Sequence, residues 1–278
     1  MALHAVQCLQ KLMRIVKYSQ NFLANAVVAR GIVALADNFP GHFIIEIGPG
    51  KGALTGIIAE RGKPFAAVEI DGAMTGRLKA RPDIARLCEI VHEDFLEADL
   101  TRFPPQGGRI LFIGNLPYSC GAAIMQKALS HPAFGGAVFM LQKEVVERIA
   151  AKPGCADYGL LSLSAQTKAR VRTAMRVGRF NFNPVPKVDS AVVELTRPER
   201  PCFENEAAEQ AFFSAAKAAF AHRRKTVINS LSLSLGASKA ELEPALKSAG
   251  IDPQSRAETI PIENYLKLAQ ILQTTRRA

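Results

Sequence analysis

The 278-residue sequence predicts an α/β protein in which a largely parallel, seven-stranded sheet is followed by a small all-helical domain. Three observations indicate this fold. Short apolar, β-rich runs alternate with helical patterns up to Leu195, as in parallel sheets that helices cover on both faces. A linker rich in Pro and in charge follows at residues 196–201. Beyond this linker the patterns are helical only.

Seven runs of β-branched and apolar residues predict the strands. The last two flank a Pro-containing loop, residues 180–189, and we expect them to form an antiparallel hairpin at the edge of the sheet. The runs are Phe43–Ile47, Pro64–Ile70, Cys88–Val91, Arg109–Ile113, Ala137–Leu141, Ala169–Val177 and Ser190–Leu195.

Helical patterns occupy the rest of the chain. They are strongest at Glu204–Ala221, Lys239–Ala249 and Ile262–Gln273, where no convincing strand pattern interrupts them. We therefore expect two domains, residues 1–198 and residues 199–278.

The charge of the chain favours a polyanionic partner. Lys and Arg number 35 against 25 Asp and Glu, which gives a formal net charge of +10. Such an excess is typical of proteins that bind nucleic acid, although a merely soluble basic enzyme is the alternative. Lys168, Arg170 and Arg172 alternate with apolar residues, so that in a strand they would share one face.

Two further segments are basic. Residues 1–36 contain four Lys or Arg and no acidic residue, and we interpret them as an arm that faces RNA rather than as a targeting segment, because Ser and Arg are scarce there. In the helical part, three consecutive residues form a basic cluster: Arg223, Arg224 and Lys225. This cluster either contacts phosphate groups or is a solvated helix face.

Cysteine usage and hydropathy indicate a cytoplasmic protein. The five cysteines are widely spaced and form no C-x-x-C pair, so neither a disulfide framework nor a metal site is predicted. No apolar run approaches the roughly 20 residues of a membrane span. A reducing compartment fits both observations, and no membrane partner is expected.

A glycine-rich loop follows the first predicted strand. Gly48, Gly50 and Gly52 stand before a helix that is expected to open at about Ala53. Glycines let the main chain turn sharply and approach a ligand at a helix N-terminus. The pattern also satisfies G-x-G-x-x-A, so the loop alone allows a dinucleotide as well as another nucleoside cofactor.

Acidic residues follow the next two predicted strands. Glu69 and Asp71 end the second run, where a carboxylate accepts hydrogen bonds from ribose hydroxyl groups. Glu93 and Asp94 end the third, where a carboxylate suits an adenine amine. Each alone is as consistent with a surface loop, but repetition at successive strand ends predicts a nucleoside site.

The fourth strand ends in Asn115-Leu116-Pro117-Tyr118, which favours a methyl donor over NAD. A dehydrogenase needs a general acid or base beside the nicotinamide, whereas methyl transfer needs only a nucleophile that is aligned with the methyl group. The Asn115 side-chain oxygen and the Leu116 carbonyl are acceptors, Pro117 restricts the chain, and Tyr118 offers a ring face. Together they suit a flat ring that bears an amine; an ordinary Asn-Pro turn is the alternative.

These motifs resemble the ribosomal RNA adenine N6,N6-dimethyltransferases of the KsgA type. The resemblance runs from about Tyr18 to Leu195 and extends into the helical part. The matching segments are Gln20–Leu23, Glu46–Gly52, Val68–Asp71, Asp94–Phe95, Asn115–Tyr118, Gln142–Val145, Phe182–Ser190, Ala219–Thr226 and Asn229–Leu231.

The resemblance implies a Rossmann-like class I methyltransferase sheet, S-adenosylmethionine as cofactor and a helical domain that docks on RNA. It also implies an activity: two methyl groups pass to each of two adjacent adenosines near the 3′ end of 16S ribosomal RNA, during assembly of the small subunit. The implied partner is a partly assembled 30S subunit, and the protein is expected to act as a monomer.

The resemblance also assigns site residues. Asn115, Leu116 and Tyr118 would hold the target base, and Phe182 would stack on its other face. The basic residues would hold the RNA backbone while the base leaves its helix. The cofactor would lie against Asn21, Leu23, Gly48, Gly50, Glu69, Asp94 and Asn115.

Two departures from the family pattern keep alternatives open. Ser19 replaces the usual Gly before Gln20, as in the related large-subunit methylases that confer macrolide resistance. Ser119-Cys120-Gly121 also differs from the usual residues after Tyr118. The alternatives are such a large-subunit methylase and a non-catalytic RNA-binding or assembly factor on the same scaffold. Erosion of the glycine loop or of Asn115–Tyr118 would indicate the latter, and neither is eroded.

Overall fold

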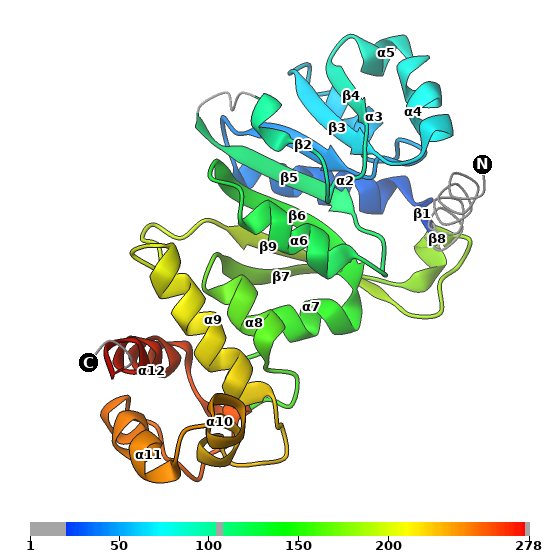
Figure 1. The fold of residues 1–278 in the computed structure, drawn as a ribbon. Helices are drawn as coiled ribbons and strands as arrows, with labels where there is room; N and C mark the ends of the chain where they lie inside the picture. Colours follow the sequence, from blue (N-terminus) through cyan, green and yellow to red (C-terminus); the bar gives the residue numbers. More distant parts are fainter. Residues whose placement is uncertain (1–20, 104–107, 276–278) are drawn as a thin grey trace, which may run out of the picture. The chain divides into compact units, whose positions relative to one another are not determined.

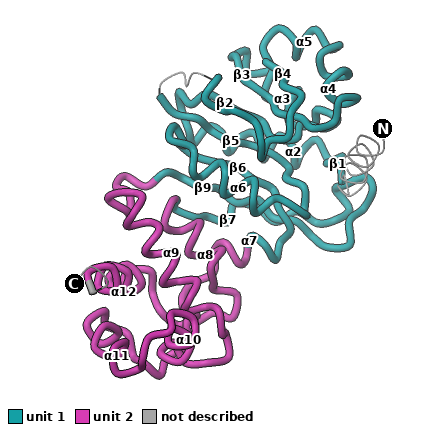
Figure 2. The backbone as a smooth tube through the Cα atoms, in the orientation of Figure 1, with its two compact units in different colours: residues 1–146, 169–197 teal, residues 147–168, 198–278 magenta. Residues whose placement is uncertain are grey.

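The computed structural model describes residues 21–103 and 108–275. Most of the basic arm predicted from the sequence, including Lys11, Arg14 and Lys17, lies outside the described residues. The chain forms two compact units, residues 1–146 with 169–197 and residues 147–168 with 198–278 (Figure 2). The domain bounds expected from the sequence stay a prediction.

The first unit is built on a mixed, seven-stranded sheet (Figure 1). Its order is β4-β3-β2-β5-β6-β9-β7, in which the first five strands are parallel and β9 is antiparallel to both neighbours. The expected antiparallel pair at the edge is therefore present as β9 and β7. The strands are β2 (Phe43–Ile47), β3 (Phe65–Glu69), β4 (Cys88–His92), β5 (Ile110–Asn115), β6 (Phe134–Gln142), β7 (Arg170–Val177) and β9 (Ser190–Thr196).

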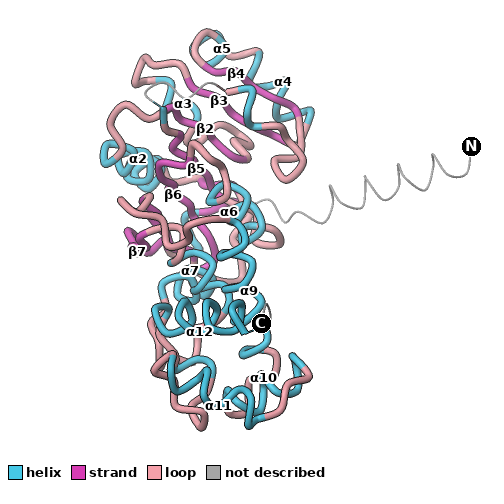
Figure 3. The backbone as a smooth tube through the Cα atoms, turned by 60° about the vertical axis from the view of Figure 1, so that its left-hand side comes forward, coloured by secondary structure: helices cyan, strands magenta, loops and turns pink. Residues whose placement is uncertain are grey.

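Helices cover both faces of this sheet, and α2 and α6 lie on opposite faces in Figures 1 and 3. On the face that α2 covers, Ile32 and Ile58 of the helices pack with Ile113 and Met140 of the strands in one apolar core. The helical segments of the unit are α2 (Ala26–Ala34), α3 (Thr55–Ala59), α4 (Gly72–Lys79), α5 (Pro82–Ala85), α6 (Gly121–Leu129) and the short 3-10 turns Leu35–Asn38, Leu100–Arg102 and Arg179–Asn181.

A second, two-stranded sheet joins distant parts of the first unit. Strand β1 (Phe22–Leu23) pairs antiparallel with β8 (Phe182–Asn183). Outside the strands, the Ala24 N–H donates to the Asn181 carbonyl at 2.8 Å, and the Asn25 side-chain amide donates to that of Asn181 at 2.8 Å. The segment that precedes α2 is thereby fixed to the loop that leads to β9.

The second unit is helical, and Figure 3 shows no strand in residues 198–275. Tyr265 and Phe212 are fully buried in its apolar core, and Tyr265 also stacks on Phe220. Its helices are α8 (Leu160–Gln166), α9 (Glu206–Phe220), α10 (Val227–Leu235), α11 (Lys239–Ser248), the 3-10 turn Ala257–Thr259 and α12 (Ile262–Thr275), while α7 (Lys143–Ala150) begins in the first unit.

No helix in the described part of the chain has both the length and the apolar character that crossing a membrane requires.

Candidate active site

A cavity lies at the carboxyl ends of the parallel strands. Its empty volume, which includes solvent at the mouth, is about 1080 Å³; ligand pockets commonly measure about 300–1,000 Å³. Strands β2 and β5 are neighbours in the sheet, but β3, which follows β2 in the chain, and β6, which follows β5, lie on opposite sides of this pair. Open α/β sheets bind ligands at such a switch point. The cavity is lined by the predicted residues Asn21, Leu23, Gly48, Gly50, Glu69, Asp94, Asn115, Leu116 and Tyr118.

The glycine loop forms one wall of the cavity. Gly48 and Gly50 have φ angles of 64° and 54°, in the left-handed region that favours glycine. An added Cβ at Gly48 would meet no heavy atom within 4 Å, whereas one at Gly50 would lie 3.0 Å from the Phe22 ring. The main chain at Gly48 therefore borders open space that a ligand can approach closely.

Glu69 holds this loop at the end of β3. Its two carboxylate oxygens accept hydrogen bonds from the Gly50 N–H at 2.8 Å and the Asp71 N–H at 2.9 Å. The side chain is only 3% exposed, and burial raises the pKa of Glu69. Each oxygen keeps a further lone pair, so the carboxylate can still accept bonds from two neighbouring hydroxyl groups.

Glu46 is a second buried carboxyl group in the cavity wall, and we did not predict a role for it from the sequence. It is 1% exposed, and its Oε2 has no hydrogen-bond partner among the described residues. Burial, with a smaller contribution from the nearby Glu69, raises the pKa of Glu46 to about 8. The signal in the sequence was its position: Glu46 stands near the end of β2, much as Glu69 ends β3.

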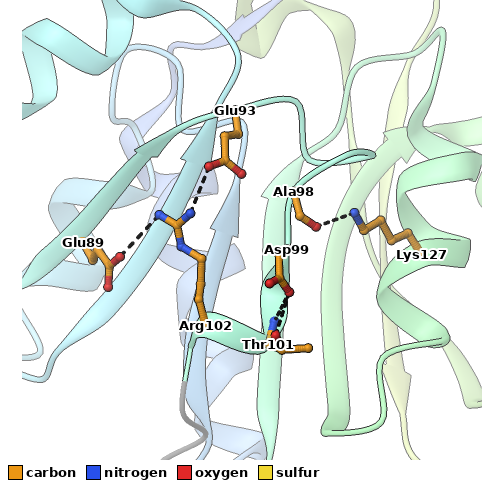
Figure 4. A network of polar contacts seen from close by, with 7 residues as sticks. All are labelled: Glu89, Glu93, Ala98, Asp99, Thr101, Arg102 and Lys127. Carbon is orange, nitrogen blue, oxygen red and sulfur yellow. Dashed lines mark hydrogen bonds and ion pairs between the residues drawn. The ribbon is translucent and has the colours of Figure 1, made fainter.

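Asp94 and Phe95 lie between Glu93 and Ala98 in the chain. Figure 4 shows the ion pairs and the hydrogen bond that hold Glu93 and Ala98 in place. Arg102 bridges Glu93, at 2.9 Å, and Glu89, at 3.6 Å, while Lys127 Nζ donates to the Ala98 carbonyl at 2.7 Å.

Within this segment, the Asp94 side chain accepts from the Leu96 N–H at 2.9 Å. Phe95 is buried and meets the Phe112 ring edge-on, at 6.1 Å between centroids. An acid and an apolar ring are thus fixed together at the cavity.

Asn115 ends β5 and faces the cavity with a defined amide orientation. Its Nδ2 donates to the Asn21 carbonyl at 3.0 Å, which assigns the nitrogen and leaves Oδ1 as an acceptor. The close approach of β5 to β2 requires glycine before it, since a Cβ at Gly114 would lie 2.5 Å from the Ile47 carbonyl oxygen.

Leu116 and Tyr118 complete this side of the cavity. The Leu116 N–H donates to the Met140 carbonyl at 3.0 Å, while the Leu116 carbonyl accepts no hydrogen bond from the described residues. The hydroxyl groups of Tyr118 and Ser190 share a hydrogen bond of 2.8 Å, and burial raises the pKa of Tyr118. That bond fixes the orientation of the Tyr118 ring.

Phe182 does not line the cavity. It is 3% exposed, pairs through β8 with Leu23, and belongs to the apolar core beneath α2. Its stacking on a target base stays a prediction, and one that would require this ring to leave the core. Cys120, from the segment that departs from the family pattern, does line the cavity, and burial raises the pKa of its thiol.

Lys168 and Arg172, two of the basic residues predicted to contact RNA, have partners within the protein. Strand β7 begins at Arg170, so Lys168 precedes it in a turn, where it forms an ion pair of 2.7 Å with Glu209. Arg172 pairs with Glu194 at 2.7 Å, and Glu194 also accepts from Asn38. Their role in RNA binding stays a prediction.

The basic cluster of the second unit lies in the turn between α9 and α10. Arg223, Arg224 and Lys225 are exposed there. The Arg223 guanidinium also donates to the Ala156 carbonyl. The cluster is therefore available to a partner of negative charge.

The mixed seven-stranded sheet, with a glycine loop and acidic residues at its carboxyl edge, defines a class I methyltransferase. A profile of the family described as "Ribosomal RNA adenine dimethylase" matches residues 14–274. The chain belongs to this family, whose members depend on S-adenosylmethionine.

Curated relatives agree with this assignment. Two proteins named "Ribosomal RNA small subunit methyltransferase A", from Geobacillus sp. and Anoxybacillus flavithermus, are 39% and 40% identical to this chain. Each covers 91% of this chain, and this chain covers 90% and 88% of them. The chain therefore spans nearly the whole length of these relatives.

Two solved structures show the same architecture. The 23S rRNA methyltransferase ErmE is 28% identical with a TM-score of 0.69, and the match covers 91% of this chain and 100% of that one. A dimethyladenosine transferase from Plasmodium falciparum, 24% identical, gives a TM-score of 0.75 over 92% of this chain and 98% of its own, which supports the fold.

Proposed function

We propose that this protein dimethylates the N6 amines of two adjacent adenosines near the 3′ end of 16S ribosomal RNA, using S-adenosylmethionine. We propose further that it acts in the cytoplasm, as a monomer, on a partly assembled 30S subunit. The observation that carries the proposal is the fixed Asn115 amide, which offers an acceptor at the end of β5 beside a nucleoside-type cavity. The relatives named for the small subunit supply the choice of RNA.

The residues present fit the cofactor. Buried Glu69 suits the two ribose hydroxyl groups, and Asp94 beside Phe95 suits an adenine amine and its ring. The open main chain at Gly48 admits the body of the ligand. The unpartnered oxygen of Glu46 adds a further polar atom to the same wall.

When bound, S-adenosylmethionine supplies a methyl group made electrophilic by its sulfonium. The protein supplies the orientation of the nucleophile. In the first transfer, Asn115 Oδ1 and the Leu116 carbonyl accept the two hydrogens of the adenine amine, which localises the lone pair on nitrogen instead of in the ring; in the second transfer one of these acceptors holds the single remaining hydrogen. Both acceptors are neutral, so they orient the amine without first removing a proton; the nitrogen loses its extra proton to solvent after the methyl group has been transferred. Positioning then supplies most of the acceleration.

Tyr118 supplies a ring against which the base lies. Its hydrogen bond to Ser190 fixes the ring at the cavity rim. A target base must leave its stack to reach this point, and base–aromatic stacking offsets part of that cost. Arg223, Arg224 and Lys225, together with Lys168, Arg170 and Arg172, are proposed to contact the RNA backbone.

The test is to incubate the protein with labelled S-adenosylmethionine and small subunits that lack the modification, and then to map the methylated bases. We expect N6,N6-dimethyladenosine at two adjacent positions near the 3′ end. Label in large subunits instead would indicate a methylase of the macrolide-resistance type, and no label in either would indicate a non-catalytic factor. The comparisons favour neither alternative.

A further inference from the structure

An exposed aromatic ring stands on the loop between β7 and β9. Phe180 is 79% exposed, and Val185 and Val188 on the same loop are 53% and 44% exposed. Seven large apolar side chains are exposed in the described part of the chain, and three of them lie on this one loop. Such a concentration of apolar surface marks a contact site more often than isolated exposed residues do.

This loop connects two walls of the cavity. Next to Phe180, the Asn181 carbonyl accepts from Ala24, and Phe182 pairs with Leu23 of the cavity wall. At its other end the loop runs into Ser190, which bonds the cavity residue Tyr118. The loop is therefore tied to the cavity on both sides.

Hydrogen bonds hold Phe180 on a defined backbone. The Arg179 N–H donates to the Asp189 carboxylate at 2.9 Å, and the Asn181 side chain donates to the Gly178 carbonyl at 2.7 Å. Phe180 is the central residue of the short 3-10 turn Arg179–Asn181. An exposed ring on a fixed turn is pre-ordered for contact, which lowers the entropy lost on binding.

The charge around the ring selects the partner. Residues 176–189 contain Arg176, Arg179 and Lys187 against one acid, Asp189. The Arg179 guanidinium lies 5.1 Å from the Phe180 ring centroid. An aromatic ring combined with positive charge is the combination by which proteins hold single-stranded nucleic acid.

We propose that Phe180 is a stacking platform for a nucleotide that flanks the target adenosines in the RNA. The proposal rests on the function proposed above and adds a contact outside the cavity. Phe180 then acts as a positioning residue: it holds the strand next to the displaced base and does not touch the reacting amine. Its contribution appears in the affinity for the RNA-containing substrate and leaves cofactor binding unchanged.

The deciding experiment compares four substitutions in the full chain on unmethylated small subunits. Phe180→Ala and Phe180→Leu are expected to raise KM for the subunits about tenfold, because neither side chain offers a ring on which a base can stack. Phe180→Tyr and Phe180→Trp are expected to stay within about twofold of wild type. The cofactor Kd should not change in any variant, and Leu233→Ala, another exposed apolar side chain, serves as the control.

Two outcomes would overturn the proposal. Wild-type behaviour of Phe180→Ala would show that the ring contributes nothing. Wild-type behaviour of Phe180→Leu alone would show that apolar area is sufficient, as in a contact with a protein surface.

A second measurement separates this inference from the proposed function. The chain contains no Trp, so Phe180→Trp introduces its one indole. We expect a single-stranded oligoadenylate to quench this fluorescence and to leave that of Leu233→Trp unchanged. Equal quenching of the two variants, or no quenching of Phe180→Trp, would contradict stacking. If wild type labels large subunits instead, the proposed function fails, while the quenching, and the same variant series measured on large subunits, still test Phe180.

Discussion

The Asn115 side-chain amide donates to the Asn21 carbonyl at 3.0 Å and thereby joins two parts of the chain that are 94 residues apart. This bond uses one of the two N–H groups of the amide and leaves its oxygen as an acceptor. A flipped amide would place its oxygen against the carbonyl oxygen of Asn21, so the orientation has one favourable state. The segment before α2 thus sets the polarity of the proposed amine-binding residue.

Asn115→Ala is expected to abolish methyl transfer while S-adenosylmethionine binding remains measurable. The variant lacks the acceptor that orients the amine, and misplacing a nucleophile costs on the order of 100-fold or more. Label incorporation into unmethylated small subunits gives the rate, and calorimetry gives the cofactor Kd. Ser119→Ala, an exposed neighbour, is the control. Full activity of Asn115→Ala would refute the mechanism.

Substitutions of Tyr118 separate its ring from its hydroxyl group. Tyr118→Phe keeps the ring and removes the bond to Ser190, so we expect activity within a few-fold of wild type and about 1 kcal/mol less stability. Tyr118→Ala is expected to lose at least tenfold in kcat/KM, because base stacking contributes about 1–3 kcal/mol. Equal losses in the two variants would assign the function to the hydroxyl group instead.

Glu46 makes stability depend on pH in a defined direction. Its pKa is about 8 in the fold and about 4.5 ordinarily, so between these values the folded protein holds a proton that the unfolded chain releases. The free energy of unfolding therefore falls as pH rises through this window, by up to about 1.4 kcal/mol per pH unit. Glu46→Gln removes this slope.

Urea unfolding of the cofactor-free protein at pH 5, 6.5 and 8 tests this. Glu46→Gln should be close to wild type at pH 5 and more stable by a few kcal/mol at pH 8. The exposed Glu204→Gln should parallel wild type throughout. Parallel curves for Glu46→Gln would show that the carboxyl group is ionised across the whole range.

Gly50→Ala is expected to destabilise the fold and weaken cofactor binding. Its φ of 54° costs a residue with a Cβ about 1–2 kcal/mol, and that Cβ would press on the Phe22 ring at 3.0 Å. Gly76→Ala is the matched control, since Gly76 lies inside α4 with open space around it. Helix propensity predicts that Gly76→Ala stabilises by up to about 1 kcal/mol. Thermal unfolding and calorimetry measure both effects.

Removal of the basic cluster should change the salt dependence of substrate binding. Replacing Arg223, Arg224 and Lys225 by Ala is expected to weaken binding to small subunits. The slope of log K against log salt should become shallower by about 0.7–0.9 for each RNA phosphate that the cluster neutralises in the wild type. The exposed Arg77→Ala should leave the slope unchanged. An unchanged slope in the triple variant would show that the cluster is a solvated surface that does not contact RNA phosphates.

The sequence predicted the sheet well because buried strands are short apolar runs with polar ends. It missed part of β6, which begins at Phe134 rather than Ala137. Gly135 and Gly136 argue against a strand locally, but they admit the His42 and Phe39 rings, which a Cβ at either position would strike. Such a contact between distant segments leaves no local pattern.

Many of the residues that line the cavity were singled out from the sequence, but the pairing of distant segments that builds its wall was not. Acidic and glycine residues at strand ends carry a spacing signal, and their strands do meet at one edge. Strands β1 and β8 have two residues each, too few for any periodicity. For the same reason the position of Phe182 in the core, away from the cavity, could not be read from its neighbouring motif.

The pairing of β1 with β8 has a consequence for the order in which the protein matures on the ribosome. Residues 21–23 line the cavity, yet their partner strand is Phe182–Asn183. A nascent chain that has exposed the glycine loop and Asn115 still lacks the strand against which this wall is built. During translation the complete cavity wall therefore cannot form until at least residue 183 has left the exit tunnel.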